Sequence, residues 1–510
     1  KLSCNWSDTK NDVEEEGRRM GSGRPWRWCE FELPLGISAE AFQLEKAVCS
    51  HGLFMMAPNY WDPLSHTLTR PLRLPLSDDC SSSSSPLSGS VIVTISQPSH
   101  RPSSLTLRVH GTGTGTGTGS ISAQQQHSLL AQVSRMLRLS ETEEKAVREF
   151  TNMSIYGEDD QNKGFNGRVF RSPTLFEDMV KCILLCNCQW PRTLSMAQAL
   201  CELQLELQNV SSIPSVVEVG ARASTSQKEK VEKEDYIPKT PATNETKKKH
   251  KTSGFSSKGK FLKNKLEFEG DGNSQEDRVF AKSLNSSLPP TDTDANLCQH
   301  SESCDNSKEL SVDDESFLGF SNGRDYFANG GIGNFPSPEE LANLDKSFLA
   351  KQCKLGYRAG RIVKLARAIV EGRVQLGLLE ELSKDASLLS YNQLTDRLKE
   401  IEGFGPFTRA NVLMCMGYYH VIPTDSETIR HLKQAHSRQS TTQTVQRDVE
   451  EIYGKYEPYQ FLAYWSEVWD FYERRFGKMN EMSCSDYKLI TASNMRSEGR
   501  GSRKKRKGVP

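Results

Sequence analysis

The sequence lacks several features that would place it in a common class of protein. Its 13 cysteines include no Cys-x-x-Cys pair, and the closest cluster, Cys182, Cys186 and Cys188, lies in an apolar stretch without a nearby histidine. This argues against a zinc or iron–sulfur site and favours reduced thiols in a nucleocytoplasmic protein. No apolar run approaches the roughly 20 residues of a membrane helix, and the polar first residues do not resemble a signal peptide. We therefore expect no membrane association and no zinc or iron–sulfur site.

A net charge is also absent, because 65 Lys and Arg residues balance 65 Asp and Glu residues. The overall charge therefore says nothing about partners, but its distribution does. Basic runs occur at Thr246–Lys251 and at Ser502–Gly508. Such runs are typical of a nuclear address or a nucleic-acid contact, and equally of an ordinary solvated segment. On the first interpretation we expect the protein in the nucleus.

The N-terminal part alternates apolar and polar residues with a period of two. In Arg27–Leu33 the residues Cys, Phe and Leu fall on one side of the chain and two glutamates on the other. The segments Ser90–Ser96 and Leu105–Val109 also have the composition of strands. One helix is expected around Ala39–Ser50. These signals predict an antiparallel sheet.

Helical spacing dominates the remainder, interrupted by a polar segment. Ser172 is expected to cap one helix, with Pro173 in its first turn, and Ser337 and Glu340 form a predicted capping box. Residues 211–324 are rich in Ser, Lys, Glu, Asp, Asn and Thr. Such a segment cannot bury enough apolar surface to offset an ordering entropy of roughly 1–2 kcal/mol per residue.

The predicted fold class is α+β, with an N-terminal antiparallel β-sheet domain followed by an all-α domain. A long disordered insertion divides the helical domain. The expected parts are a disordered tail (1–24), the sheet domain (25–122), the first helical part (123–210), the insertion (211–324), the second helical part (325–482) and a basic disordered tail (483–510).

A Gly-Phe-Gly turn, Gly403 to Gly405, connects two predicted helices at Tyr391–Ile401 and Pro406–Met416. The glycines allow positive φ and leave N–H groups unshielded at a helix N-terminus, which suits a phosphate group. A phosphate held in this way is bound without reading sequence. An ordinary turn between two helices would show the same pattern.

Asp425 stands about twenty residues later, at the start of a predicted helix, Ser426–Ala435. Two interpretations are open. Thr424 or Asp425 caps this helix, with Glu427 completing a capping box from Thr424. Alternatively, Asp425 is a functional carboxylate that acts together with the glycine turn.

The turn and the aspartate together resemble the helix-hairpin-helix DNA glycosylase superfamily, in which a Gly/Pro-rich hairpin precedes an essential aspartate. The segments CKLGYRAGRIVKLARAIVEG, NFPSPEEL and DMVKCILLCNCQWPRT are similar to those of 8-oxoguanine DNA glycosylases. The N-terminal segment from FELPL to TRPLRL is similar to the small sheet domain of that family and of bacterial 3-methyladenine glycosylases. The resemblance covers about 31–482, without the insertion.

The resemblance implies roles for individual residues. Asp425 matches the essential carboxylate, Asn187 the residue placed in the gap left by a flipped base, and Arg192 the residue that reads the orphaned partner base. The implied DNA contacts are Gly403, Phe404, Gly405, Thr408, Asn187 and Arg192. The implied base pocket includes Phe407, Tyr464 and Val468, although core packing of the last helix is the favoured explanation for most of its aromatic residues. The hairpin carbonyls are implied to coordinate a monovalent cation, with no other cofactor.

One departure from the family pattern concerns the chemistry. Bifunctional members place a lysine two residues after the second hairpin glycine, where this sequence has Phe407. Arg409 is near, but a guanidinium stays protonated and cannot form a Schiff base. We therefore expect a monomeric, monofunctional DNA glycosylase that acts on damaged bases in double-stranded DNA, with Asp425 stabilising the sugar cation and activating water. The alternatives are a non-catalytic DNA-binding protein of this fold and a lyase using another amine, such as Lys433.

Overall fold

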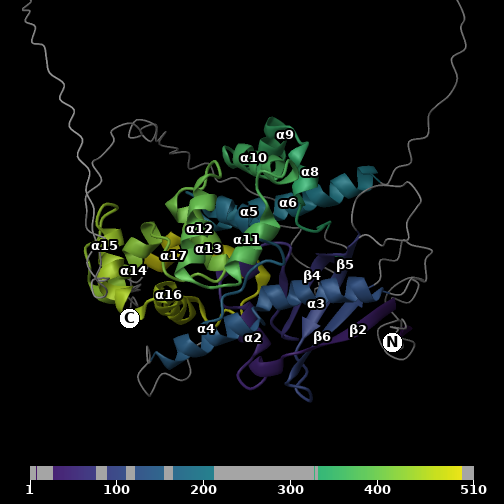
Figure 1. Cartoon of the computed structure of the whole chain (residues 1–510), viewed down its shortest axis with the longest axis horizontal. Coiled ribbons are helices and arrows are strands. Elements are labelled where there is room, and N and C mark those ends of the chain that lie inside the picture. The colour runs from purple at the N-terminus through teal and green to yellow at the C-terminus, as the bar shows by residue number, and fades with distance from the viewer. Residues whose placement is uncertain are drawn as a thin grey trace, which may run out of the picture. The chain divides into compact units, whose positions relative to one another are not determined.

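The computed structural model describes residues 7–8, 27–75, 89–110, 121–153, 165–211, 327 and 331–496 (Figure 1). Most of the tail predicted at 1–24, the Gly-Thr tract and residues 497–510 lie outside these described residues, as does the insertion predicted at 211–324 apart from its first residue. Among the described residues, no helix combines the length and the apolar character that crossing a membrane requires.

The described strands form one six-stranded antiparallel sheet in the order β1-β2-β6-β5-β4-β3. In chain order they are β1 (Ser7–Asp8), β2 (Arg27–Pro34), β3 (Tyr60–Asp62), β4 (Thr67–Arg73), β5 (Ser90–Ser96) and β6 (Ser104–His110). The prediction of an antiparallel sheet is therefore confirmed. The two residues of β1 pair with β2, so this part of the expected tail belongs to the sheet.

The predicted period-two alternation decides which face of the sheet is buried. Cys29 and Phe31 are buried on β2, and Phe31 stands opposite the buried Leu107 of β6. Glu30 and Glu32 point to the solvent-accessible side. The helix α3 (Ala123–Leu137) lies along the sheet and contacts β4 (Figure 1).

The helix expected around Ala39–Ser50 is shorter in the structure, where α2 spans Leu44–Val48. The side chain of Gln97 explains its late start. It accepts a hydrogen bond from the Leu44 N–H at 2.8 Å and donates to the Phe42 carbonyl at 3.2 Å. These contacts hold the chain extended at Gln43, with φ −130° and ψ 122°, immediately before the helix.

The remaining described helices pack around one another beside the sheet (Figure 1). They are α4 (Glu141–Asn152), α5 (Leu175–Leu185), α6 (Trp190–Ser211), α8 (Pro338–Ala342), α9 (Lys346–Gln352), α10 (Arg358–Val370), α11 (Leu376–Ser383), α12 (Leu388–Lys399), α13 (Pro406–Cys415), α14 (Ser426–His436), α15 (Val445–Tyr453), α16 (Gln460–Phe476) and α17 (Ala492–Arg496), with short 3₁₀ helices η1 (Gly36–Ser38), η2 (Gly52–Met55), η5 (Gly454–Tyr456) and η6 (Cys484–Leu489).

Two predicted helix starts have different outcomes. The capping box at α8 is confirmed, because Ser337 and Glu340 exchange both hydrogen bonds and Pro338 occupies the first turn. The predicted cap of α5 is wrong, since Thr174 rather than Ser172 accepts the hydrogen bond from the N–H of Glu177. Ser172 is instead buried, and its N–H donates to the Asp178 carboxylate at 2.7 Å.

Helix α5 lies at the centre of the helical part and is also linked to the sheet. Every residue from Leu175 to Leu184 is buried, and the helix contacts α6, α10 and α13. Arg70 of β4 reaches Glu177 of α5 through a two-pronged ion pair with hydrogen bonds of 3.2 and 2.9 Å. The ammonium group of Lys181 lies 2.8 Å from the same carboxylate, and all three side chains are almost fully buried.

The predicted end of the helical part at residue 482 is too early. The chain continues through η6 and α17, and Tyr487 and Met495 are buried. The ring of Tyr487 packs edge-on against Phe54, with centroids 5.5 Å apart. This contact to the N-terminal part extends the ordered chain to residue 496, whereas the last basic run lies outside the described residues.

Candidate functional site

The hairpin between α12 and α13 uses its two glycines differently. Gly403 has φ +87°, and a Cβ atom there would lie 2.7 Å from Cδ of Arg361. Gly405 has φ −67° and ψ 176° as the N-cap of α13, and a Cβ atom there would meet nothing within 4 Å. The expectation of positive φ therefore holds for Gly403 and is wrong for Gly405.

The first turn of α13 presents backbone N–H groups that have no intrahelical acceptor. Pro406 occupies the first helical position and has no N–H, and the first helical bond runs from the Arg409 N–H to the Gly405 carbonyl at 3.0 Å. Gly405 has no side chain to cap the N–H groups of Phe407 and Thr408. These donors and the helix dipole together favour an anion at this end.

The other hairpin residues are partly engaged within the protein. Phe404 and Thr408 are buried. The Thr408 hydroxyl lies 3.1 Å from the Sγ atom of Cys186, and the Phe404 carbonyl accepts a hydrogen bond from Arg409 at 2.8 Å. The predicted DNA contacts of Phe404 and Thr408 can therefore involve only their backbone, and one of the carbonyls expected to coordinate a cation already has a donor.

Asn187 follows Cys186, just after the end of α5. It is exposed and has φ +47°. The start of α10 holds this segment: Arg358 donates to the carbonyls of Cys186 and Asn187, the latter at 3.1 Å, and the Tyr357 hydroxyl donates to the Cys186 carbonyl at 3.1 Å. Sequence patterns do not point to Tyr357 and Arg358, because only the fold brings α10 to the end of α5.

Basic side chains surround this region. Arg192 is exposed and donates only to the Lys354 carbonyl, at 3.3 Å. Arg361 lies over the ring of Tyr357, 4.8 Å from its centroid, and beside Gly403. Within the described part of the chain, none of Arg192, Lys354 and Arg361 forms an ion pair with a carboxylate. The hairpin and Asn187 are thus accompanied by cations that are available to phosphate groups.

Asp425 is the N-cap of α14, as one of the two interpretations predicted. Its Oδ1 atom accepts hydrogen bonds from the N–H groups of Glu427 and Thr428, both at 2.9 Å, and from the Thr428 hydroxyl at 3.2 Å. Thr428, not Glu427, completes the capping box, because its hydroxyl also accepts from the Asp425 N–H. Glu427 pairs with Arg430 instead.

The second carboxylate oxygen of Asp425 is available for chemistry. No described residue donates a hydrogen bond to Oδ2, and the residue is exposed to solvent. Partial burial of the carboxylate raises its pKa, the hydrogen bonds from Thr428 oppose this, and the charge of Glu427 raises the pKa further. The net result is a pKa above the ordinary value of 3.8. One oxygen therefore fixes the orientation, while the other has no donor among the described residues.

The predicted base pocket is not open in the structure. Tyr464 is buried and its hydroxyl lies 3.2 Å from that of Thr428, whereas Val468 is completely buried in the core of α16. Only Phe407 is partly exposed. Val468 is thus a core residue, as the alternative interpretation proposed. Burial is the main cause of the raised pKa of Tyr464, and the nearby charge of Asp425 is the next cause.

The structure thus brings the site residues together in two groups. The hairpin, Asn187 and Arg192 are connected through α5 and α10, and Asp425 is connected to Tyr464 on α16 through Thr428. Among the described residues, no hydrogen bond or ion pair joins the two groups. A cavity of about 1050 Å³ lies elsewhere, where Arg171, Tyr419 and Tyr459 line it.

The two glycines allow a matched test of the hairpin. We expect Gly403→Ala to destabilise the fold by roughly 1–3 kcal/mol, because φ +87° is strained for any L-residue and Arg361 stands in the way. On the expectation that the hairpin contacts DNA, the same variant should also bind duplex DNA more weakly. Gly405→Ala has an ordinary backbone conformation and open space, so we expect a change in stability within about 1 kcal/mol. Urea unfolding and fluorescence anisotropy with a labelled duplex measure both effects. Equal stability and equal DNA binding of Gly403→Ala and Gly405→Ala would contradict the different roles described for the two glycines.

No family model matches the sequence, and no curated protein matches it. The structure is similar to a number of solved structures, among them the following three. The first is MBOgg1 in complex with a low affinity DNA ligand, with a TM-score of 0.40, 13% identity and coverage of 92% of this chain and 99% of that chain.

The second is the Clostridium acetobutylicum 8-oxoguanine glycosylase/lyase in complex with double-stranded DNA containing cytosine opposite 8-oxoG, with a TM-score of 0.40, 10% identity and coverage of 89% and 96%. The third is the 3-methyladenine DNA-glycosylase from Archaeoglobus fulgidus, with a TM-score of 0.43, 13% identity and coverage of 86% and 98%. These values describe a resemblance and assign neither family membership nor activity to this chain.

Proposed function

We propose that this protein is a monofunctional DNA glycosylase that hydrolyses the N-glycosidic bond of a damaged base in duplex DNA. The observation that carries the proposal is the state of Asp425. Its Oδ1 atom is fixed by three hydrogen bonds, whereas Oδ2 has no donor among the described residues. The free Oδ2 of a carboxylate whose orientation is already fixed in this way is available to a bound substrate.

The geometry suits a reaction in which positive charge develops on a sugar. Breaking an N-glycosidic bond gives an oxocarbenium-like transition state, which a nearby carboxylate stabilises. Asp425 would supply this charge through Oδ2 and would orient or deprotonate the attacking water. Its orientation requires no reorganisation during the reaction, because the first turn of α14 already holds Oδ1.

We assign binding of the DNA strand to the hairpin region. The unsatisfied N–H groups at the start of α13 and the unpaired cations Arg192 and Arg361 would hold phosphate groups, which requires no particular base sequence. Asn187, held on a strained backbone by Arg358, would fill the position of a nucleotide that has left the stack. The groove that receives this base would have to open on binding, because Tyr464 and Val468 are buried.

The residue at the position of the family's lysine favours hydrolysis over a lyase reaction. Phe407 stands where a nucleophilic lysine would be required. Lys433 is exposed, but it lies eight residues along α14 from Asp425, a rise of about 12 Å. A sugar carbon beside Asp425 would therefore be beyond the reach expected for a Schiff base with this side chain.

A panel of duplexes, each carrying one damaged base, tests the proposal. We expect release of a free base and formation of an abasic site without strand cleavage, which appears only after treatment with alkali. A covalent adduct trapped by borohydride would contradict the monofunctional assignment. Binding of damaged duplexes without release of any base would instead identify a non-catalytic DNA-binding protein, and no binding at all would contradict both.

A further inference from the structure

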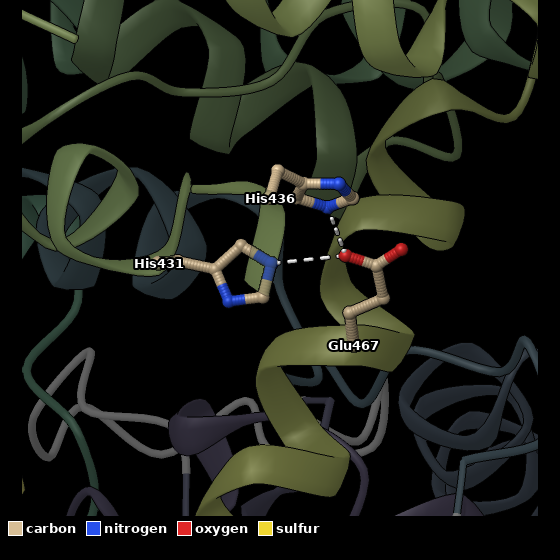
Figure 2. Close-up of side chains that lie close together, drawn as sticks. All are labelled: His431, His436 and Glu467. Atoms are coloured by element: carbon tan, nitrogen blue, oxygen red, sulfur yellow. Dashed lines mark hydrogen bonds and ion pairs between the residues drawn. The ribbon is translucent and has the colours of Figure 1, made fainter. Parts of the chain in front are cut away.

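Two histidines and a glutamate converge at the C-terminal end of α14, the end opposite Asp425 (Figure 2). His431 Nε2 lies 3.0 Å and His436 Nε2 lies 2.8 Å from Oε2 of Glu467. All three ligand atoms lie within 4.8 Å of one another. Figure 2 shows both imidazole rings turned toward the same carboxylate, which comes from α16.

The set of two imidazole nitrogens and one carboxylate oxygen is well suited to a divalent transition metal, and to Zn²⁺ in particular. Tetrahedral Zn²⁺ with bonds of about 2.0–2.2 Å places its ligand atoms about 3.3–3.6 Å apart. The observed separations from the carboxylate oxygen, 2.8 and 3.0 Å, are somewhat shorter, and the two imidazole nitrogens lie within 4.8 Å of each other. A small outward rotation of the three side chains would therefore accommodate an ion.

The surroundings of the cluster support a defined geometry. Tyr453 is completely buried at the end of α15, and its hydroxyl donates to Oε2 of Glu467 at 2.7 Å. Hydrogen bonds of this kind orient carboxylate ligands in metal sites. His431 is 3% exposed, whereas the side chains of His436 and Glu467 are 26% and 35% exposed. An ion could thus reach the site from the side of His436. The Tyr453 hydroxyl lies 3.2 Å from His431 Nε2 and 3.0 Å from His436 Nε2, so it stands at the fourth position of the cluster.

We propose that His431, His436 and Glu467 bind one Zn²⁺ ion, which joins the C-terminal end of α14 to α16. The expectation of no zinc or iron–sulfur site rested on the arrangement of the cysteines and did not consider this set. Because α14 begins immediately after Asp425, the ion anchors the helix that carries the proposed catalytic carboxylate. The metal site itself is independent of the proposed glycosylase activity.

The competing explanation is a hydrogen-bonded cluster without a metal, in which both histidines donate from Nε2 to the same carboxylate oxygen. Direct metal binding distinguishes the two. The full chain is treated with a chelator and titrated with Zn²⁺ by calorimetry and with Co²⁺ by absorption spectroscopy. We expect one equivalent of each ion, with Co²⁺ giving the visible bands of four-coordinate nitrogen and oxygen ligation. Intense near-ultraviolet bands from thiolate ligation would instead indicate the free cysteines and overturn the assignment.

Matched variants locate the ion. His436→Gln and Glu467→Gln should each lose stoichiometric Co²⁺ binding while keeping the helical circular dichroism spectrum. The control is His66→Gln, because His66 also pairs with a glutamate, Glu45, at 2.7 Å but has no third ligand. This control should bind Co²⁺ as the wild-type chain does.

Zn²⁺ should also raise the melting temperature of the chelator-treated wild-type chain, and of Asp425→Asn, but not that of Glu467→Gln. Retention of metal binding by Asp425→Asn separates this proposal from the proposed function. The proposal is overturned if the wild-type chain binds no stoichiometric Co²⁺. It is also overturned if His436→Gln and Glu467→Gln bind as tightly as the wild type.

Discussion

Asp425→Asn is expected to reduce base excision by at least about 10²–10³-fold, the typical effect of removing one group that stabilises transition-state charge. Asparagine caps helices as well as aspartate does, so the hydrogen bonds to Glu427 and Thr428 should persist. The neutral amide cannot stabilise a cationic sugar. Single-turnover excision on the damaged-base duplex that the wild type cleaves best measures the rate, and anisotropy measures DNA binding, which should be unchanged.

The same substitution should not destabilise the protein at neutral pH. The raised pKa of Asp425 means that the folded state disfavours the ionised carboxylate relative to the unfolded chain. Removing the charge should therefore leave the melting temperature unchanged or higher. Lost activity with retained or increased stability would distinguish a functional carboxylate from a structural cap.

Asp345→Asn is the matched control. Asp345 is the N-cap of α9 and accepts a hydrogen bond from the Phe348 N–H at 2.8 Å, so the chemical change is the same at another helix. It should leave excision within about twofold, since we assign it no catalytic role. If Asp425→Asn retained wild-type excision, the assignment of the carboxylate would be wrong.

The pH dependence of the wild type follows from the same carboxylate. Asp425 acts only when ionised, and its pKa lies above the ordinary 3.8. Excision should therefore fall as the pH is lowered, and the fall should begin at a higher pH than an unperturbed aspartate would give. The acid limb of the rate at saturating enzyme reports this pKa. An acid limb centred below pH 3.8 would contradict the environment described for this residue.

Glu177→Gln is expected to produce the largest loss of stability, about 3–5 kcal/mol in urea unfolding at pH 7. Arg70 and Lys181 are both completely buried beside this carboxylate. The substitution preserves side-chain volume but leaves two buried cations without a counter-charge. Because Arg70 lies on β4 and Glu177 on α5, the effect falls on the contact between sheet and helices.

A surface pair provides the comparison for this prediction. Glu30 and Arg108 form an ion pair at 2.9 Å between neighbouring strands, with both side chains at least 35% exposed. Glu30→Gln should cost no more than about 1 kcal/mol, because solvent screens such pairs. Similar losses of stability for Glu177→Gln and Glu30→Gln would show that the charges of Arg70 and Lys181 are not desolvated as described.

The stability contributed by Glu177 should also depend on pH. Burial by itself raises the pKa of this carboxyl, but the charges of Arg70 and Lys181 more than offset this and lower the pKa to about 2. A folded-state pKa below the unfolded value of 4.5 means that the contribution is complete above pH 4.5 and is lost as the pH falls toward 2. The difference in the free energy of unfolding between the wild type and Glu177→Gln should therefore shrink as the pH falls from 4.5 toward 2.

Local signals in the sequence predicted most of the elements. The alternation in β2, β5 and β6 and the capping box of α8 depend on residues within one or two turns of one another, so they can be read without the fold. The glycine hairpin and the N-cap aspartate are signals of the same kind. The error at α5 is also local, since both Ser172 and Thr174 can cap a helix, and the contact from Asp178 to Ser172 decided between them.

Local sequence signals could not predict contacts between segments that are far apart in the chain. The sequence could not show that Cys186 would bury the Thr408 hydroxyl, or that Arg358 would hold the carbonyl of Asn187, because these residues are 222 and 171 positions apart. The spacing of His431 and His436 likewise differs from the four-residue spacing that places two side chains on one helix face. Only the ending of α14 at His436 and the approach of α16 bring them to Glu467.

The sequence by itself therefore determined most of the secondary structure, the buried face of the sheet, the hairpin and the position of the carboxylate at a helix start. The tertiary structure alone decided the burial of side chains in the helical part, which oxygen of Asp425 remains free and which distant residues meet. The physical reason is range: backbone propensity and capping act over a few residues, whereas burial and ion pairing depend on where packing places segments that are far apart in the chain.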